Sequence, residues 1–321
     1  MSRKSEALKR IDTSKGQGLE LGPLSSPLVS KQKATVFYVD HLSTEGLRKH
    51  YEGHGFEDEI VPVDYVIRDD SLSRTLAGKQ FDYVIASHVI EHIPDMVGWL
   101  ADVGKVLKEG GIFSLVIPDK RYTFDIMRNE SRPADVIGAY LDKQTKVSSA
   151  VVYDNFSAIR KDIVPYEVCS HPYADYGKKP TQYSLEKAYE LCLQNLKPGE
   201  YVDTHCHVFT PHSFFTVLRG LIEHDLFGYE VIYFKDTPPN QLEFYVSLRK
   251  VSKNTRAARL KSIPKVPRPK EKRELELEII ELRQANEALT AELRNVMTSK
   301  SWQITKPVRK AVKLSHRIRR K

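Results

Sequence analysis

Short apolar runs alternate with stretches of helical periodicity through the first 250 residues. Three of the runs, TVFYV, FDYVIA and GIFSLVI, are rich in β-branched and aromatic residues and almost continuously hydrophobic. Strands that are buried on both faces of a parallel sheet have this pattern. The pattern predicts five such strands: Gly18–Leu21, Thr35–Val39, Glu59–Val63, Phe81–Ala86 and Gly111–Ile117.

The segment between the fourth and fifth runs predicts a helix. Pro94 lies in its first turn, and Gly110 and Gly111 are expected to end it. Apolar residues recur at helical spacing between them, at Met96, Val97, Leu100, Val103, Val106 and Leu107. Alternation of buried strands with such helices predicts a doubly wound α/β domain.

Two later segments extend this domain. Thr210 as cap and Pro211 at the first position predict a helix start. The segments YEVIYFKD and QLEFYVSLRK, joined by TPPN, predict an antiparallel hairpin. Residues from about 122 to 200 fit no strand of this sheet and are rich in tyrosines and polar turns, which indicates an insertion that covers the site.

The character of the chain changes after residue 250. Residues 251–270 are basic and contain three prolines, which predicts an extended linker. A heptad pattern follows over 271–298, with Asn286 at one core position, and it favours a parallel two-stranded coiled coil. The other core positions are Leu275, Leu282, Leu289 and Val296 at d, and Ile279 and Leu293 at a. The alternative is a single amphipathic helix that packs on its own domain.

The net charge of +8 belongs to the C-terminal segment. Nine of the 50 basic residues lie in 300–321, which holds no acidic residue, so the rest of the chain has 41 basic and 42 acidic residues. A basic substrate groove in the globular part is therefore not supported. No apolar run is long enough for a membrane span or a secretory signal, and the three cysteines have no CxxC spacing, so a cytoplasmic protein is expected.

The first strand runs into LELGPLSSP, a turn with the single glycine Gly22. Leu24 and Ser26 stand where a dinucleotide-binding loop has further glycines, which argues against a pyrophosphate ligand. Acidic residues end the first three predicted strands, with Glu20 suited to an ammonium group, Asp40 to a ribose diol and Asp64 to an adenine amine. This set favours a cationic amino-acid nucleoside, and the alternative is that each acid is a solvated strand-end residue.

Motifs in a fixed order resemble those of class I S-adenosylmethionine-dependent methyltransferases over residues 17–250, after an N-terminal extension of residues 1–16. The motifs are LELGPLSSP, VDHL, VDYVIRDDSL, FDYVIASHVIEHIPD, VLKEGGIFSLVIPDKRYTFD and HVFTPHSF. More narrowly, they resemble a bacterial branch with E-x-G-P and no further glycines. The resemblance implies a seven-stranded Rossmann-like sheet ending in the hairpin.

The same resemblance implies how S-adenosyl-L-methionine binds. Glu20 and Gly22 would face its methionine part, and Asp40 would take the ribose. Asp64 would lie on the adenine side. At the end of the fourth strand, Ser87 and His88 would lie beside the cofactor.

Methyl transfer to a hydroxyl needs alignment of donor and acceptor and a base for the acceptor's proton. His88 and Asp119 are the predicted catalytic residues, and Arg121, His205 and His207 are predicted to bind the acceptor.

Two neighbouring residues have other expected roles. His92 is expected to cap or pack the following helix. On a strand, Asp203 would share one face with His205 and His207, a pattern that could bind zinc. No second strand supplies a partner ligand, so no metal is expected.

The C-terminal segment SKSWQITKPVRK resembles a motif, S-x-S-W-x-x-T-x-P-x-R, that follows coiled coils in bacterial cell-surface glycan enzymes. The residues at 299–321 form a basic amphipathic tail that suits an anionic membrane surface, at the inner face of the plasma membrane. Nucleic acid is the less favoured partner, because no nucleic-acid fold accompanies the tail.

The favoured function is O-methylation of a sugar hydroxyl or phosphate of a bacterial surface polysaccharide or its lipid-linked precursor, by a homodimer held through the coiled coil. Two alternatives stay open. One is a non-catalytic assembly module with a degenerate cofactor site, and the other is a methyltransferase of a small soluble metabolite.

Overall fold

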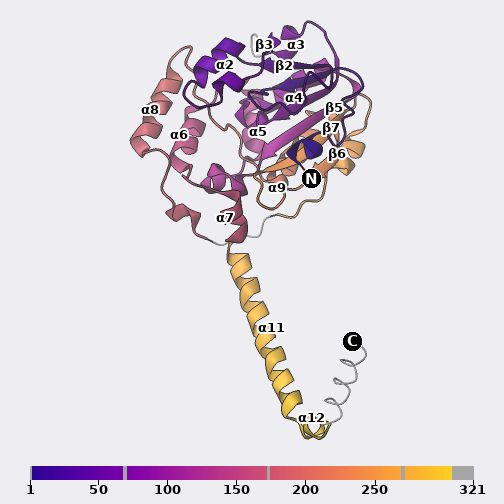
Figure 1. Cartoon of the computed structure of the whole chain (residues 1–321), viewed down its shortest axis with the longest axis vertical. Coiled ribbons are helices and arrows are strands. Elements are labelled where there is room, and N and C mark those ends of the chain that lie inside the picture. The colour runs from indigo at the N-terminus through magenta and orange to yellow at the C-terminus, as the bar shows by residue number, and fades with distance from the viewer. Residues whose placement is uncertain (1, 68–70, 172–173, 269–271, 306–321) are drawn as a thin grey trace. The chain divides into compact units, whose positions relative to one another are not determined.

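The computed structural model describes residues 2–67, 71–171, 174–268 and 272–305, with only the backbone for residues 272–277. The chain divides into two compact units, residues 1–268 and residues 269–321. The first unit contains the sheet and the helices that cover it (Figure 1).

A seven-stranded sheet organises the first unit in the order β3-β2-β1-β4-β5-β7-β6. Strands β1 to β5 run parallel, and β7 pairs antiparallel with both β5 and β6. The predicted doubly wound sheet with a terminal hairpin is therefore confirmed. The strands are β1 Gly18–Leu21, β2 Val36–Asp40, β3 Tyr65–Val66, β4 Phe81–Ser87, β5 Leu107–Pro118, β6 Tyr229–Lys235 and β7 Glu243–Lys250.

Helices cover both faces of this sheet. The α-helices are α1 Arg3–Ala7, α2 Thr44–His50, α3 Leu72–Thr75, α4 Met96–Val106, α5 Pro133–Leu141, α6 Ser149–Ala158, α7 Pro165–Ser170, α8 Leu185–Leu196, α9 Pro211–Glu223 and α10 Arg256–Ser262, with α11 Lys272–Thr298 and α12 Lys300–Ile304 in the second unit. Short 3-10 helices are η1 Glu57–Glu59, η2 Ile90–His92, η3 Lys120–Tyr122, η4 Phe124–Met127 and η5 Tyr176–Lys178. Thr210 caps α9 with Pro211 in its first turn, as predicted.

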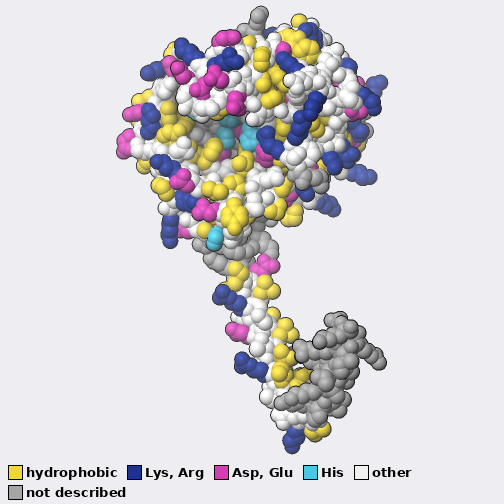
Figure 2. Space-filling model, in the orientation of Figure 1, with side chains coloured by type: hydrophobic (Ala, Val, Ile, Leu, Met, Phe, Trp, Pro, Cys, Tyr) yellow, Lys and Arg dark blue, Asp and Glu magenta, His cyan; other side chains and the backbone are white. Residues whose placement is uncertain are grey.

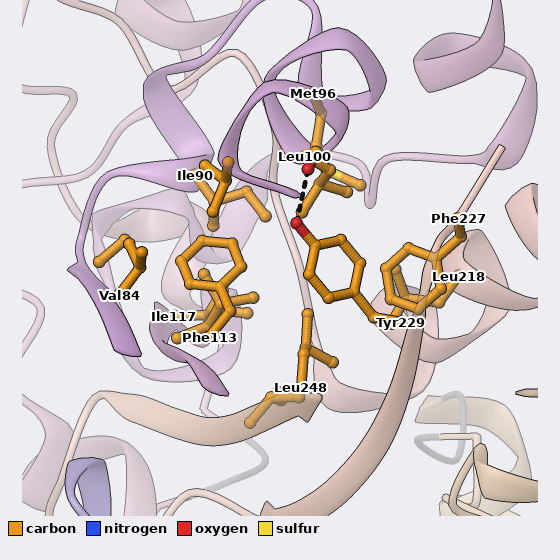
Figure 3. Packing of buried hydrophobic residues seen from close by; sticks show 14 of the residues in the cluster. Val84, Ile90, Met96, Leu100, Phe113, Ile117, Leu218, Phe227, Tyr229 and Leu248 are labelled. Atoms are coloured by element: carbon orange, nitrogen blue, oxygen red, sulfur yellow. Dashed lines mark hydrogen bonds between the residues drawn. The ribbon is translucent and has the colours of Figure 1, made fainter. Parts of the chain in front are cut away.

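The larger core lies where α4 and α9 pack on the sheet. Side chains of β4 and β5, such as Val84 and Phe113, meet α4 through Leu100 (Figure 3). The hydroxyl of the buried Tyr229 donates a hydrogen bond of 2.7 Å to the backbone oxygen of Leu100. The opposite face of the sheet packs against Ala7 of α1 and the loop after β1. The sheet is thus buried on both sides, which explains its nearly continuous hydrophobic strands.

Two predicted boundaries are wrong. The third strand was expected at Glu59–Val63, whereas η1 and an irregular segment occupy that region and β3 is Tyr65–Val66. Pro62 lacks the backbone N–H that a ladder needs. Helix α4 ends at Val106 instead of at the glycines, since Leu107 already pairs with Phe81. Gly110, with φ +77°, lies inside β5 where its register shifts.

The region expected to be an extended linker includes α10, which contacts β6 and α9. Ile263 is buried in the main core, and Leu260 and Val266 pack against it. Apolar residues at these positions give the segment a face to bury, so it folds onto the first unit.

The region expected to be an insertion contains η3 to η5 and α5 to α8. Helices α6 and α8 pack together around a small core of their own, with Val152 and Ala188 fully buried. Helix α5 packs on α4 and α9. The described part of the predicted insertion is thus made of helices joined by loops, with one isolated bridge between Arg160 and Thr181.

In the second unit, α11 spans most of the predicted coiled coil. Leu282, Leu289, Leu293 and Val296 of the heptad are exposed in the single chain. In the described part of the chain, no helix is both long and apolar enough to cross a membrane. Residues 306–321, and with them most of the predicted membrane tail, lie outside the described residues.

Candidate cofactor and acceptor site

The sheet has its switch point between β1 and β4, because the chain builds outwards from β1 in one direction and from β4 in the other. Ligands of such sheets bind beyond the carboxyl ends of the strands at this point. Gly22 follows β1 with φ +62°, and His88 follows β4 with φ +55°. A side chain at Gly22 would come within 3.2 Å of Val89, so the two turns lie in close contact. A non-glycine residue at positive φ is strained, as is typical of functional sites.

Glu20 shapes the loop after β1. Its carboxylate is buried and accepts hydrogen bonds from the backbone N–H groups of Leu28, at 2.6 Å, and Val29, at 3.0 Å. Burial raises the pKa of Glu20, while these two hydrogen bonds oppose the rise. Glu20 was predicted to receive a ligand ammonium group, directly or through water, and in this structure both of its oxygens accept from the loop. The carboxylate instead holds in place a loop that lacks the usual glycines.

Asp40 is the last residue of β2 and lies at the ligand edge of the sheet. Its Oδ1 atom accepts a hydrogen bond of 2.7 Å from the backbone N–H of His41 and lies 2.7 Å from Nδ1 of the same residue. No described residue forms a hydrogen bond with its Oδ2 atom. A buried carboxylate with one available oxygen is suited to accept from a hydroxyl pair.

Asp64 does not lie at this edge. It precedes β3 and accepts hydrogen bonds of 2.7 Å each from the backbone N–H of Tyr38 and from Nζ of Lys31. The prediction that Asp64 reaches an adenine amine is therefore wrong. Its cause is the misplaced third strand. The chain leaves β3 through residues 67–70, of which 68–70 lie outside the described residues.

His88 belongs to a polar cluster that joins distant parts of the chain. Its Nε2 atom lies 2.6 Å from Oε2 of Glu243, the first residue of β7. Arg3 of α1 donates to the same carboxylate at 2.8 Å and to Oγ of Ser87 at 2.5 Å. Burial would raise the pKa of Glu243, but the hydrogen bond from His88 and the charge of Arg3 hold it below its usual value. Arg3 and Glu243 could not be predicted from local patterns, because their contacts join residues more than 80 positions apart in the chain.

Asp119 and Arg121 form a closed ion pair. Asp119 is fully buried, and its Oδ2 atom accepts from Nη2 of Arg121 at 2.6 Å and from the hydroxyl of Thr237 at 2.7 Å. Its Oδ1 atom accepts from the backbone N–H and Nε of Arg121, each at 3.0 Å. A carboxylate with this many donors is a poor base, so the predicted catalytic role of Asp119 is not supported. Burial opposes the charge of Arg121, yet Asp119 raises the pKa of its guanidinium.

Residues 201–207 lie across the ends of β2 and β4 without forming a strand. The ring of Tyr201 lies 5.9 Å from that of His41 after β2, and Asp203 lies 2.8 Å from Nδ1 of His92 after β4. The expectation that Asp203, His205 and His207 share one face of a strand is therefore wrong.

His207 turns away from its two neighbours. It is buried, and its Nε2 atom lies 2.9 Å from the backbone oxygen of Ile93. Burial lowers its pKa to about 4, so the ring is neutral at pH 7. The prediction that His207 binds the acceptor is not supported. His92 does not cap α4 either, since Asp95 does so.

His205 lies in the site and meets His92 with ring centroids 4.7 Å apart. Together with Glu91, these histidines form a group whose possible ligand atoms all lie within 4.8 Å of one another. Figure 2 shows histidine side chains side by side in a recess of this unit. Glu91 was not predicted as a site residue. Its charge inside the short apolar stretch VIEHIP was the available signal.

Residues 20–113 match the family model described as a methyltransferase domain. This part of the chain is therefore similar to methyltransferase domains. The matched part includes the ends of β1, β2 and β4 and stops before the helical insertion and residues 201–207. The matched residues therefore lie on the cofactor side of the site, and the match does not extend to the acceptor side.

Two curated relatives are similar over this part of the chain. Both are named ubiquinone biosynthesis O-methyltransferase. The protein from Methylobacterium nodulans is 36% identical over 109 residues, which is 34% of this chain and 40% of the relative. The one from Paramagnetospirillum magneticum is 32% identical over 114 residues, 35% of this chain and 41% of the relative. The chain thus matches about two fifths of the length of each relative.

Solved structures of similar fold include an S-adenosylmethionine-dependent methyltransferase from Mesorhizobium loti. It is 13% identical, with 74% of this chain and 92% of that chain covered, at a TM-score of 0.38.

Proposed function

We propose that the protein is an S-adenosyl-L-methionine-dependent O-methyltransferase. The observation that carries the proposal is Asp40, a buried acid with one available oxygen at the end of β2, beside the Gly22 turn at the switch point of a methyltransferase domain. Glu20 occupies the backbone N–H groups of Leu28 and Val29, so these cannot bind a pyrophosphate. The site therefore fits a nucleoside without phosphates better than a dinucleotide.

The cofactor supplies a methyl group on a sulfonium. Transfer breaks the S–CH3 bond and forms an O–CH3 bond, and the acceptor's hydroxyl proton has to pass to a base. His88 is the candidate base at the end of β4. Its side chain is 33% exposed, and Glu243 orients it through Nε2, as in other histidine–carboxylate pairs. Asp119 is excluded from this role by its ion pair with Arg121.

For the acceptor, we propose a hydroxyl or phosphate of a bacterial surface glycan or its lipid-linked precursor. The support is the SKSWQITKPVRK segment after the heptad helix α11. A small soluble acceptor is the second candidate, and the names of the two relatives favour it. Removing residues 269–321, the whole second unit, separates the two. Glycan modification at a membrane should fail in the truncated protein, whereas methylation of a soluble acceptor should persist.

The first test is calorimetric titration of the full chain with S-adenosylmethionine and S-adenosylhomocysteine, in the presence of EDTA. We expect one site per chain with micromolar affinity for both. If the folded protein binds neither compound, the enzyme proposal is refuted, and an assembly role for α11 becomes the better explanation.

A further inference from the structure

Glu91 is a buried carboxylate without a counterpart. It is 0% exposed, and neither of its oxygens has a hydrogen-bond partner among the described residues. Nδ1 of His88 lies 3.6 Å from Oε1 of Glu91, which is too far for a hydrogen bond. Burial of an unpaired carboxylate is strongly unfavourable, because no donor replaces the water that it loses. Buried charges in proteins are accordingly paired or bound to a metal ion.

Two histidines present free ring nitrogens near this carboxylate. Nδ1 of His92 lies 2.8 Å from Asp203, and Nδ1 of His205 lies 2.5 Å from Asp125. These contacts leave Nε2 of each ring without a partner among the described residues. Histidines that bind metals are usually held in this way, with the second nitrogen on a carboxylate.

The supporting carboxylates are themselves fixed. Asp125 is buried and accepts a hydrogen bond of 2.9 Å from Nη1 of Arg128, which also donates to the backbone oxygen of His205 at 3.0 Å. Asp203 accepts a hydrogen bond of 3.0 Å from the hydroxyl of Tyr201. Both carboxylates are thus held in place and can orient their histidines.

We propose that Glu91, His92 and His205 bind a divalent transition-metal ion, with Asp203 and Asp125 orienting the two rings. Two imidazole nitrogens and one carboxylate oxygen are ligands suited to Zn²⁺, Mn²⁺ and Co²⁺, whereas Mg²⁺ sites are built mainly from oxygen. Ligand atoms of a tetrahedral ion lie about 3.4 Å apart, so atoms that now lie up to 4.8 Å apart draw together by about 1 Å around the ion. Three protein ligands leave a coordination position open.

The open position deepens the proposed function, on which this step rests. Glu91 and His92 directly follow the β4 turn that carries His88, and residues 201–207 bring His205 over it. The ion would therefore lie beyond the end of β4, beside the candidate base His88. A metal ion lowers the pKa of a bound hydroxyl and so assists removal of its proton.

The test uses the untagged full chain, stripped with EDTA and titrated with Zn²⁺, Mn²⁺ or Co²⁺ alone by calorimetry. We expect one ion per chain and a visible Co²⁺ absorption spectrum. Both Glu91→Gln and His205→Gln should weaken binding at least tenfold, and Asp125→Asn should weaken it roughly 10- to 100-fold. His54→Gln, in an exposed loop, is the matched control and should bind as the wild type does.

Stoichiometric binding that is unaffected by Glu91→Gln and His205→Gln would overturn the proposed ligand set, and no binding by the folded wild type would overturn the site. Should Glu91→Gln fail to fold, His205→Gln alone decides. Catechol serves as an oxygen-ligand probe of the Co²⁺ protein, and an unchanged spectrum would refute the open position. These readouts need no S-adenosylmethionine, and the cofactor titration contains EDTA, so either proposal can fail without the other.

Discussion

Asp40→Asn tests the cofactor site most directly. The oxygen that accepts from the backbone N–H of His41 can be retained by the asparagine, so the local turn should persist. The available Oδ2 atom is replaced by an NH2 group. This group is a hydrogen-bond donor, so it cannot accept the hydrogen bond that a ribose hydroxyl donates. The substitution therefore removes a charge-assisted hydrogen bond while it changes the side-chain volume little.

The expected magnitude follows from the strength of such a bond. Hydrogen bonds to charged groups contribute about 1.5–3 kcal/mol, and each 1.4 kcal/mol changes affinity about tenfold. Asp40→Asn should thus weaken S-adenosylmethionine binding roughly 10- to 150-fold in calorimetric titration. S-adenosylhomocysteine should lose a similar factor, since it carries the same ribose.

Asp64→Asn is the matched control, because it is the same substitution at the residue that precedes the neighbouring strand β3. Asp64 binds Lys31 and the backbone of Tyr38 and lies away from the ligand edge. Its variant should bind the cofactor within about twofold of the wild type. If Asp40→Asn also stays within that range while folded, or if the two variants lose affinity equally, the assignment of the ribose site is refuted.

Three further predictions concern the fold and its assembly. Tyr229→Phe should lower the free energy of unfolding in urea by about 1 kcal/mol, since it removes one buried hydrogen bond to Leu100 and no carbon atoms; no change would show that the bond adds nothing. The pKa of Glu243 is lowered in the folded protein, so the stabilising effect of its carboxylate is complete above the usual glutamate pKa of 4.5 and is lost as the pH falls below that value. In urea unfolding, the Glu243→Gln variant should therefore lose less stability than the wild type as the pH falls below 4.5. An equal loss in the two proteins would contradict this sign. Leu289→Asp should convert a dimer into a monomer in sedimentation experiments if α11 forms the predicted coiled coil, and a wild-type monomer would refute that coil.

Local patterns were sufficient wherever a strand or helix is defined by its own residues. β1 lies at the predicted residues, and the Thr210–Pro211 start of α9 is the predicted one. The hairpin of β6 and β7 was also predicted, because alternation and a proline-containing turn act over a few residues. The third strand failed for the opposite reason. It is two residues long, and only its pairing with β2 defines it.

The same distinction runs through the site. Gly22, Asp40 and His88 could be assigned to this edge because each lies at the end of a predicted strand, and strand ends of a doubly wound sheet meet at one edge. Asp64 was misplaced with its strand. Asp119 lies at the predicted position. Its partner Thr237 is 118 residues away in the chain, and the hydrogen bond from the Thr237 hydroxyl occupies Oδ2 of Asp119.

The sequence by itself determined the order of strands and helices, the α/β class, and the edge at which a ligand binds, because these depend on periodicity and on short turns. Only the tertiary structure decided what each polar side chain does there. Glu20 binds the backbone of its own loop. Glu91 is buried beside His92 and beside His205, which lies more than 100 residues later in the chain. The availability of a carboxylate depends on donors that approach it through space, and the spacing of residues along a chain does not encode that approach.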